Sequence, residues 1–500
     1  MVEPSQTGIS RELALITRWI AAASVALLFG AVSLGGGGTA GAAGPDVEGS
    51  GGRAVAHHAG GAPIKSPAVL RKAPSAEMFR VGLNSSEPTL GVNEDNEVFY
   101  VAFQTNTRVE VVKSSDEGKT WDIVSPKFPN GRNAQLLSLD PYVFVDDTEG
   151  SNRIFTIDLT VACSYLSFSD DSGKSWITNP LACGRPVNDH QTLFAGPPAI
   201  SPTVGYPSVV YYCWNDIASS SCSKSLDGGI TFTPTTPAFV GEDPNRDEGS
   251  LQGQDVRGFC GGLHGHGYVG EDGTVFVPRG YCGTPELAIS KDEGLTWTKA
   301  TVSKKVPISG HEASVATDSK GNIYYSWVGD KDRLPYLSIS KDEGKTWSKP
   351  MMVGAPGLRE ANLPSLDVGA PGHVAIAYMG SENSPGMPFP EFGECTAIGA
   401  CPEPDKYKKV SWNGYMTETH NALDNDPLFY SGTVNNKKDP LIRGTCGPGR
   451  CKAVFDFIDI VISPKGETWA AWVDGCITVC PDPRATSNMG SDGVVSRLKY

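Results

Sequence analysis

Short apolar segments recur along the chain from residue 97 onward, and polar turn residues separate them. These segments are rich in β-branched and aromatic residues, which favours strands over helices. No amphipathic helical period lies between them, so a sheet-only fold is predicted. The seven segments cover residues 97–103, 153–159, 208–214, 274–280, 322–328, 373–379 and 467–473.

A turn motif, S-x-D-x-G-x-[ST]-[WF], follows five of the blocks of strands. Its Ser and Asp side chains can bond nearby backbone N–H groups, and its Gly permits a positive φ angle. The aromatic residue that follows can pack between neighbouring units. The five copies are Ser114–Trp121, Ser169–Trp176, Ser225–Phe232, Ser290–Trp297 and Ser340–Trp347.

The spacing of the motif predicts the architecture. The five aspartates, at positions 116, 171, 227, 292 and 342, lie 55, 56, 65 and 50 residues apart. Strands that repeat at this period predict an all-β β-propeller of four-stranded antiparallel blades. Seven blades are expected, with six as the alternative. The last unit lacks a fourth strand, which Met78–Asn84 can supply to close the ring and remove an exposed sheet edge.

The N-terminus predicts export. Arg11 and Arg18 precede an apolar run, Trp19–Leu34, and Ala40-Gly41-Ala42 fits a signal-peptide cleavage site. We therefore expect a signal peptide over residues 1–42, a flexible Gly/Ala/Pro-rich linker over 43–76 and a propeller over 77–500. The mature protein is expected to be secreted, monomeric and without a membrane span.

Twelve cysteines fit an oxidising compartment. They fall in sequential couples that predict local disulfides, although spacing alone does not fix connectivity. The couples are Cys163/Cys183, Cys213/Cys222, Cys260/Cys282, Cys395/Cys401, Cys446/Cys451 and Cys476/Cys480.

Composition excludes some partners. The chain has 42 Lys and Arg against 56 Asp and Glu, a net charge of −14. An acidic surface repels phosphate backbones and anionic lipid headgroups, so neither nucleic acid nor a membrane surface is an expected partner.

The five turns resemble the Asp boxes, or BNR repeats, of the sialidase (neuraminidase) superfamily. That resemblance implies a propeller over about residues 78–500 and an exo-α-sialidase type of glycoside hydrolase acting on terminal acidic sugars. Such enzymes bind the substrate carboxylate with three arginines and use a tyrosine nucleophile assisted by a glutamate. Asp boxes also occur in propellers that do not hydrolyse anything, so a non-catalytic propeller that binds a glycan or a protein is the alternative.

The resemblance also implies roles for individual residues. Tyr378 is the expected nucleophile and Glu312 its partner, while Arg80, Arg279 and Arg333 are expected to bind the carboxylate. Gly82 stands where the family has proline, and Trp327 stands where it has arginine. The loop Gln104–Arg108 contains no aspartate, so Asp189 or Glu87 is expected to replace the usual acid/base.

The repeat independently predicts where a site would form. In a propeller, the loops that join blades and the hairpins beyond them open on one side of the central channel. Charged groups from separate blades would therefore meet at one mouth. The joining loops carry Glu87, Asp189, His190, His264, His266, His311, Glu312 and Glu360. Four of these histidines could bind a metal, but no carboxylate lies at a fixed ligand spacing, so no metal or cofactor is expected.

Overall fold

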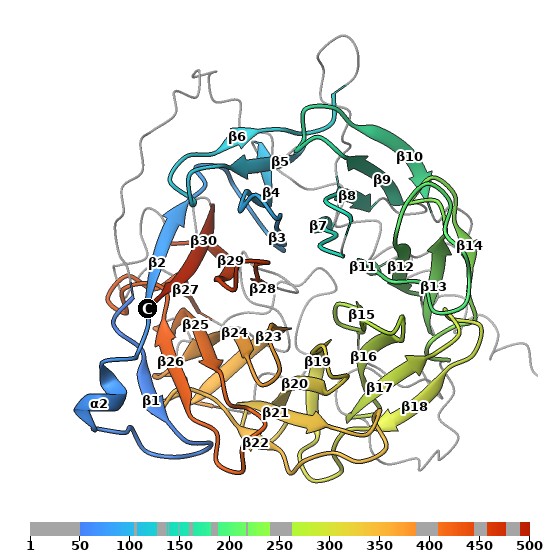
Figure 1. Ribbon diagram of the computed structural model, residues 1–500. Coiled ribbons are helices and arrows are strands. Elements are labelled where there is room, and N and C mark those ends of the chain that lie inside the picture. Colours follow the sequence, from blue (N-terminus) through green and yellow to red (C-terminus); the bar gives the residue numbers. More distant parts are fainter. Residues whose placement is uncertain are drawn as a thin grey trace, which may run out of the picture.

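The computed structural model is a ring of seven antiparallel sheets around a central axis (Figure 1). It describes residues 51–104, 108–127, 138, 140–148, 150–159, 164–181, 189–216, 219–240, 263–386, 409–444, 458–476 and 491–500. The seven-bladed prediction is confirmed, and the six-bladed alternative is excluded. The expected signal peptide lies outside the described residues, and the described part of the chain has no helix both long and apolar enough to cross a bilayer.

In the first five blades the strands run outward in chain order, so the first strand of each blade faces the axis. The blades comprise β3 (Leu90–Val92), β4 (Val98–Gln104), β5 (Arg108–Ser114) and β6 (Asp122–Ile123); β7 (Pro141–Val145), β8 (Ile154–Leu159), β9 (Ser164–Ser169) and β10 (Ile177–Leu181); β11 (Asp189–Gly196), β12 (Val209–Asn215), β13 (Ser220–Ser225) and β14 (Thr233–Pro234); β15 (Tyr268–Val269), β16 (Val275–Tyr281), β17 (Thr284–Ser290) and β18 (Thr298–Thr301); and β19 (Ile308–Thr317), β20 (Ile323–Gly329), β21 (Pro335–Ser340) and β22 (Met351–Met352).

The last two blades recruit strands from the N-terminal part of the chain. The sixth contains β23 (Glu360–Val368), β24 (Val374–Ser381), β25 (Ser411–Thr419) and β26 (Phe429–Thr433), with β1 (Val55–His57) on its outer edge and β27 (Ile442–Arg443) paired with β25. The seventh contains β28 (Asp459–Ile462), β29 (Thr468–Asp474), β30 (Asp492–Lys499) and, outermost, β2 (Ser75–Arg80). The one helix among the described residues is α2 (Pro67–Leu70).

These N-terminal strands confirm one prediction and correct another. The strand expected around Met78 does close the ring, as β2. The expected linker is wrong from residue 51 on, because β1 pairs with β26 and buries Ala54 and Ala56 against Tyr430. Small residues with little hydrophobic pattern can still form an edge strand when a neighbouring sheet offers unpaired backbone groups.

Each predicted motif turn forms the bond pattern that its residues allow. In the first, Ser114 Oγ donates to Asp116 Oδ1 at 2.9 Å, and Gly118 N donates to Ser114 Oγ at 2.8 Å. Thr120 N donates to Asp116 Oδ1 at 2.8 Å. Gly118 has φ 86°, a conformation that glycine adopts without strain. The turn therefore fixes the passage from the third to the fourth strand of a blade.

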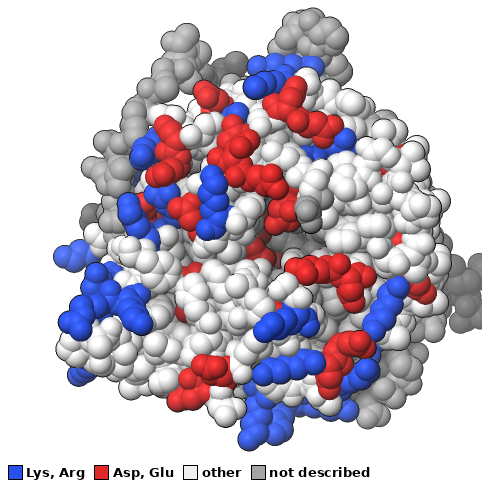
Figure 2. All heavy atoms as spheres, in the orientation of Figure 1, with Lys and Arg blue, Asp and Glu red and all other residues white. Residues whose placement is uncertain are grey.

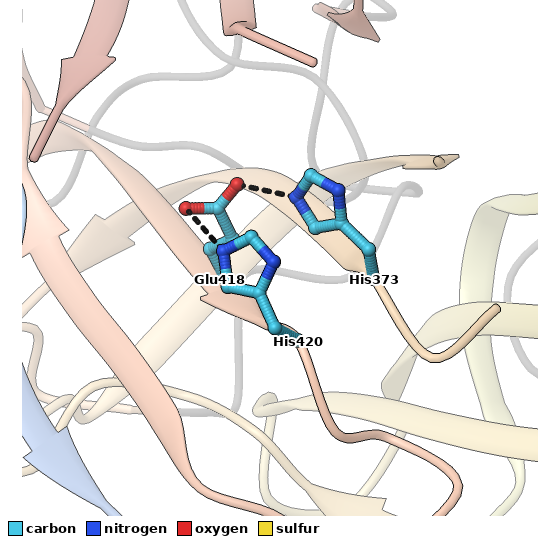
Figure 3. Close-up of side chains that lie close together, drawn as sticks. All are labelled: His373, Glu418 and His420. Atoms are coloured by element: carbon cyan, nitrogen blue, oxygen red, sulfur yellow. Dashed lines mark hydrogen bonds and ion pairs between the residues drawn. The ribbon is translucent and has the colours of Figure 1, made fainter. Parts of the chain in front are cut away.

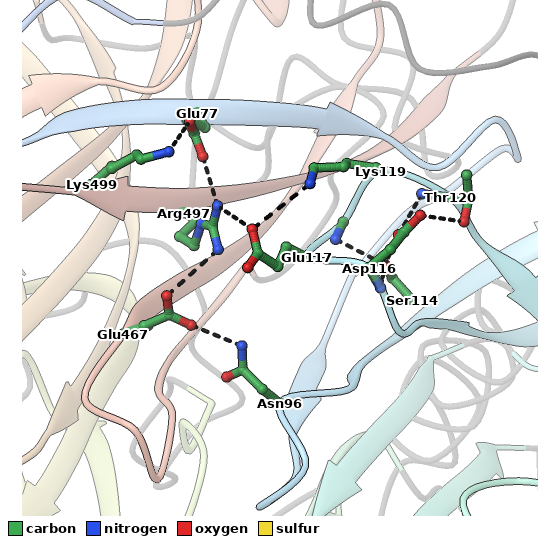
Figure 4. A network of polar contacts seen from close by, with 11 residues as sticks. Glu77, Asn96, Ser114, Asp116, Glu117, Lys119, Thr120, Glu467, Arg497 and Lys499 are labelled. Carbon is green, nitrogen blue, oxygen red and sulfur yellow. Dashed lines mark hydrogen bonds and ion pairs between the residues drawn. The ribbon is translucent and has the colours of Figure 1, made fainter.

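Charged side chains reinforce the joint between the last blade and the first (Figure 4). Arg497 on β30 donates to Glu77 of its own blade at 2.9 Å and to Glu117, in the first motif turn, at 3.1 Å. Glu467 lies 3.5 Å from Arg497 and accepts a bond from Asn96 of the first blade. Phe79 and Trp469 pack with Leu90 and Tyr100 beneath this network. Polar and apolar contacts thus join the two ends of the ring.

One predicted cysteine couple lies wholly within the described residues. Cys213 and Cys222 form a disulfide between directly opposed positions of β12 and β13, as predicted. Cys282 and Cys476 are also disulfide-bonded. The remaining cysteines lie outside the described part of the chain.

The net negative charge is unevenly distributed. On the face shown in Figure 2, Asp and Glu side chains border the hollow at the centre of the ring. Glu94, Asp147, Glu271, Asp318 and Asp367, which lie near the ends of inner strands, act electrostatically on Tyr268 or on one another. One end of the channel is therefore acidic.

Candidate functional site at the start of the inner strands

Three inner strands are bulged near their starts, at the end of the channel that we call the strand-start mouth. The ladder shifts between Asp189 and Thr192 in β11, between Ile308 and Ala313 in β19, and between Asn362 and Ser365 in β23. A bulge inserts an extra residue and redirects the side chains beside it. His190 and Glu312 lie inside two of these bulges, and His190 has the unusual φ of 51°.

His190 and Glu312 meet across the channel. The His190 Nε2 and Glu312 Oε1 atoms lie 2.7 Å apart, and the side chains are only 2% and 5% exposed. The backbone N–H of His190 donates to Asp140 Oδ2 at 3.0 Å, which fixes the bulged segment of β11 against the second blade. The pair joins the third and fifth blades and spans the fourth.

The fourth blade places His264 beside this pair. The His264 ring lies edge-on to the His190 ring, with centroids 6.0 Å apart. Gly265 makes the close packing feasible, because a Cβ there would lie 1.8 Å from the Ala313 carbonyl oxygen. Burial is the largest cause that holds the pKa of His264 well below its usual value, and electrostatic repulsion from His190 and Arg279 lowers this pKa further. His264 is therefore a neutral imidazole at physiological pH.

Arg279 also reaches this group of side chains. Its backbone pairs with that of His264 in an isolated β-bridge, and its Nη1 donates to Ser220 Oγ at 2.8 Å. Arg279 lies near the end of β16, which is the second strand of its blade and not the one that faces the axis. Strand composition does not report distance from the axis, since first and second strands are both buried.

His266 and Asp459 occupy the channel itself. His266 Nδ1 lies 3.5 Å from Asp459 Oδ1, and the His266 ring is edge-on to Tyr142, with centroids 5.1 Å apart. Asp459 also accepts bonds from Leu90 N at 3.1 Å and Ser365 Oγ at 3.5 Å. These contacts join the first, second, fourth, sixth and seventh blades.

A small pocket opens beside these groups. Its polar lining comes from the fourth, fifth and sixth blades and consists of His266, Glu312, Ser314 and Ser365. Its apolar lining consists of Ala313, Pro364 and Ile458. Carboxylate, imidazole and hydroxyl groups in one concavity of this size can hydrogen-bond a single hydroxyl group or a water molecule. We call His190, His264, His266, Arg279 and Glu312 the channel cluster.

Arg333 belongs to a different arrangement. Its Nε lies 3.7 Å from Glu360 Oε1, both side chains are buried, and Ser384 also donates to Glu360. Burial lowers the pKa of the Arg333 guanidinium, while Glu360 opposes this shift. Arg333 also has φ 58°, and its carbonyl oxygen accepts a bond from Ala361 N at 2.6 Å. These contacts give Arg333 a role in joining the fifth and sixth blades.

Arg80 and Tyr378 have structural partners of their own. Arg80, on the outermost strand of the seventh blade, lies 2.8 Å from Asp474 and 3.3 Å from Asp492. Tyr378 is fully buried, stacked on Tyr415 with centroids 5.5 Å apart. Its hydroxyl accepts a bond from Ala355 N at 2.9 Å and contacts Thr417 at 3.1 Å. Neither residue lines the pocket.

Burial raises the pKa of Tyr378 to about 12, despite the bonds at its hydroxyl. A tyrosine nucleophile needs an accessible, easily deprotonated hydroxyl. The structure therefore does not bring the expected three arginines and the tyrosine to one point.

The other expected residues lie at the starts of inner strands. Glu87 is buried just before β3 with φ 50°, and Asp189 begins β11 opposite Asn215. The side chain of His311 lies outside the described part of the chain. Asp140 and Asp459 were not singled out from the sequence. Asp140 directly precedes an apolar inner strand and Asp459 begins one, and a polar residue at that place is the signal that identified His190 and Glu312.

No protein-family model and no curated protein matches the chain. Among solved structures, the Hadza microbial sialidase Hz136 is similar at 17% identity with a TM-score of 0.37, over 60% of this chain and 64% of that one. The NanB sialidase from Streptococcus pneumoniae is similar at 11% identity with a TM-score of 0.38, over 60% and 66%. An Aleuria aurantia lectin in complex with α-methyl-L-fucoside is similar at 13% identity with a TM-score of 0.39, over 72% and 98%. At this level of similarity, no activity or ligand of these proteins is assigned to this chain.

Proposed function

We propose that the protein is a secreted carbohydrate-binding propeller, whose ligand binds at the strand-start mouth against the channel cluster. The observation that carries this proposal is the pocket that Glu312 and His266 line from separate blades. His190 holds the Glu312 carboxylate in place, so a ligand hydroxyl would meet a pre-oriented acceptor.

Hydrolysis of a terminal acidic sugar is a second candidate function, and one observation favours it. Glu312 both lines the pocket and lies 2.7 Å from an imidazole nitrogen, which is the arrangement of a carboxyl group that can exchange a proton. A route through Tyr378 is disfavoured, because its hydroxyl lies in the core. A hydrolase here would use Glu312, with Asp189, expected from the sequence, as the candidate second carboxylate.

The test combines binding with turnover. The purified protein is screened against a panel of neutral and acidic glycans, and the tightest ligand is titrated calorimetrically into wild type, Glu312→Gln, His266→Gln and Tyr378→Phe. We expect the first two substitutions to weaken binding at least about tenfold, as loss of a buried hydrogen bond implies, and Tyr378→Phe to leave it unchanged.

The same four proteins are then incubated with a fluorogenic sialoside. No turnover by wild type is the expected result. Turnover that disappears in Glu312→Gln but survives in Tyr378→Phe would favour the hydrolase. If wild type binds no glycan and turns over no glycoside, both functions are wrong.

A further inference from the structure

A second group of chemically active side chains lies in the sixth blade, near the C-terminus and apart from the channel cluster. His373 directly precedes β24, Glu418 lies near the end of β25, and His420 directly follows β25. Val374 pairs with Thr419, so the antiparallel register places His373 opposite His420. Residues two apart on a strand share a face, so Glu418 and His420 project to the same side. Figure 3 shows the three side chains converging.

Thr419 and Asn421, the residues on either side of His420, explain why His420 is held at the surface. Thr419 Oγ1 donates to Asn421 Oδ1 at 3.0 Å, and Leu428 N donates to the same oxygen at 2.9 Å. The first of these bonds repeats the Ser–Asp bond of an Asp box, with Thr and Asn in place of Ser and Asp, but the second comes from a residue seven positions on and not four. His420 occupies the variable position between them, where the side chain turns outward.

The donor atoms of this group point at one another. Glu418 lies 2.7 Å from His373 Nε2 and 4.0 Å from His420 Nε2, and the two imidazole rings stack with centroids 4.1 Å apart. Tyr500 donates to Glu418, and its hydroxyl lies 3.0 Å from His420 Nε2. In the described part of the chain, this is the one group of three His, Cys, Asp or Glu residues whose possible metal-binding atoms all lie within 4.8 Å of one another.

The donor types suit a cation. An imidazole nitrogen offers a lone pair, and a carboxylate offers negative charge.

We propose that His373, Glu418 and His420 bind a transition-metal ion, with Zn²⁺ as the preferred occupant and Tyr500 or water in the fourth position. Two imidazole nitrogens and one carboxylate oxygen are a common ligand set for Zn²⁺, whereas Ca²⁺ and Mg²⁺ prefer oxygen donors throughout. Thr468 Oγ1 donates to Glu418 at 2.6 Å and orients it from behind, as outer-shell groups do in zinc sites. His420 is 53% exposed, which leaves a route for the ion.

Such a site would join three parts of the chain. Glu418 and both histidines belong to the sixth blade, Thr468 lies on β29 of the seventh, and Tyr500 is the last residue. A bound ion would therefore stabilise the joint between these two blades. This role is independent of any ligand at the strand-start mouth.

The experiment titrates Zn²⁺ calorimetrically into the EDTA-treated full chain, with Co²⁺ as a spectroscopic probe of the ligand set. We expect one ion per chain, the visible absorption of four-coordinate Co²⁺ and a higher melting temperature with Zn²⁺. His373→Gln and His420→Gln should each weaken binding at least about tenfold. His58→Gln is the matched control, because His58 also lies beside a carboxylate, that of Asp426, at 3.0 Å.

Because His420 is exposed, His420→Gln should fold even if His373→Gln does not. Zn²⁺ binding that is equally tight in wild type and His420→Gln would overturn the proposal. So would equal losses of affinity in His420→Gln and His58→Gln.

Discussion

His190 Nε2 and Glu312 Oε1 lie 2.7 Å apart, although 122 positions separate the two residues in the chain and their blades are not neighbours. Both residues sit in bulges that interrupt the ladder of an inner strand. Non-glycine residues with positive φ persist only where surrounding contacts fix them, and His190 has such contacts at Asp140 and Glu312. The mouth of the channel is thus held in shape before any ligand arrives.

Breaking this pair should cost stability non-additively. Glu312→Ala or His190→Ala alone would leave a buried polar partner without its bond, a loss of about 1–3 kcal/mol. The double variant should cost less than the sum of the single variants, because the second substitution removes the stranded group. Denaturant unfolding of the four proteins measures this difference. Strict additivity would show that the pair contributes no coupling energy.

An Asp box should tolerate Asn better than Ala. Asp292 accepts bonds from Ser290 Oγ at 2.8 Å and from Thr296 N at 2.8 Å, both on Oδ1. The Oδ1 atom of Asn can accept both bonds, and Asn421 Oδ1 accepts the equivalent hydroxyl bond from Thr419 in the sixth blade. We expect Asp292→Ala to lower the free energy of unfolding by about 1–2 kcal/mol and Asp292→Asn by less than half of that. Lys291→Ala, at the exposed neighbouring position, is the control and should change stability little.

The fold was more predictable from the sequence than the site, for physical reasons. The motif turns repeat because each blade needs the same corner, so their spacing revealed the ring. The sequence does not reveal that β16 with Arg279 and β24 with Tyr378 are the second strands of their blades, because two adjacent buried strands have the same composition. The bulges at His190 and Glu312 leave no periodic signal.

The approach of His373 to His420 also depends on strand register, which sequence does not display. The same holds for β1, whose three residues are too few to carry a hydrophobic pattern of their own. In each case the missing information is which distant backbone or side chain a segment will meet.

Glu293 should make stability depend on pH in the acidic range. Its carboxylate accepts bonds from the backbone N–H groups of Ala199, Ile200 and Ser201 and lies 2.7 Å from Lys224. Burial tends to raise the pKa of Glu293, but Lys224 and these donors together lower it to about 2.

A lowered pKa in the folded state means that the contribution is complete above the unfolded value of about 4.5 and is lost as the pH falls toward 2. Glu293→Ala should therefore destabilise the protein by at least about 1 kcal/mol at pH 7 and by progressively less below pH 4.5. Glu293→Gln should recover part of the loss, because an amide oxygen still accepts the backbone bonds. Thermal melts from pH 3 to pH 7 would show this. A difference from wild type that stays constant over that range would contradict the assignment.

Asp367, at the acidic end of the channel, should act in the opposite sense. Burial raises its pKa to about 7, even though Ile462 N donates to it at 2.6 Å and Val368 N at 2.8 Å; the charges of Asp147 and Asp459 add to the increase. The folded protein therefore keeps a proton on Asp367 at pH values where the unfolded chain has lost it. Its contribution to stability is present below about pH 4 and is lost as the pH rises through 7.

Asp367→Asn should consequently flatten the decline in melting temperature between about pH 5 and pH 8, since the amide cannot ionise. Asp227→Asn makes the same change in net charge, but Ser225 and Thr231 lower the pKa of Asp227 against the effect of burial, so its influence falls on the acid side of this window. Parallel melting curves for wild type, Asp367→Asn and Asp227→Asn separate the two effects. If Asp367→Asn keeps the wild-type slope while Asp227→Asn alters it, Asp367 is already ionised in the folded protein at pH 5, and its carboxylate is solvated well enough to hold the charge.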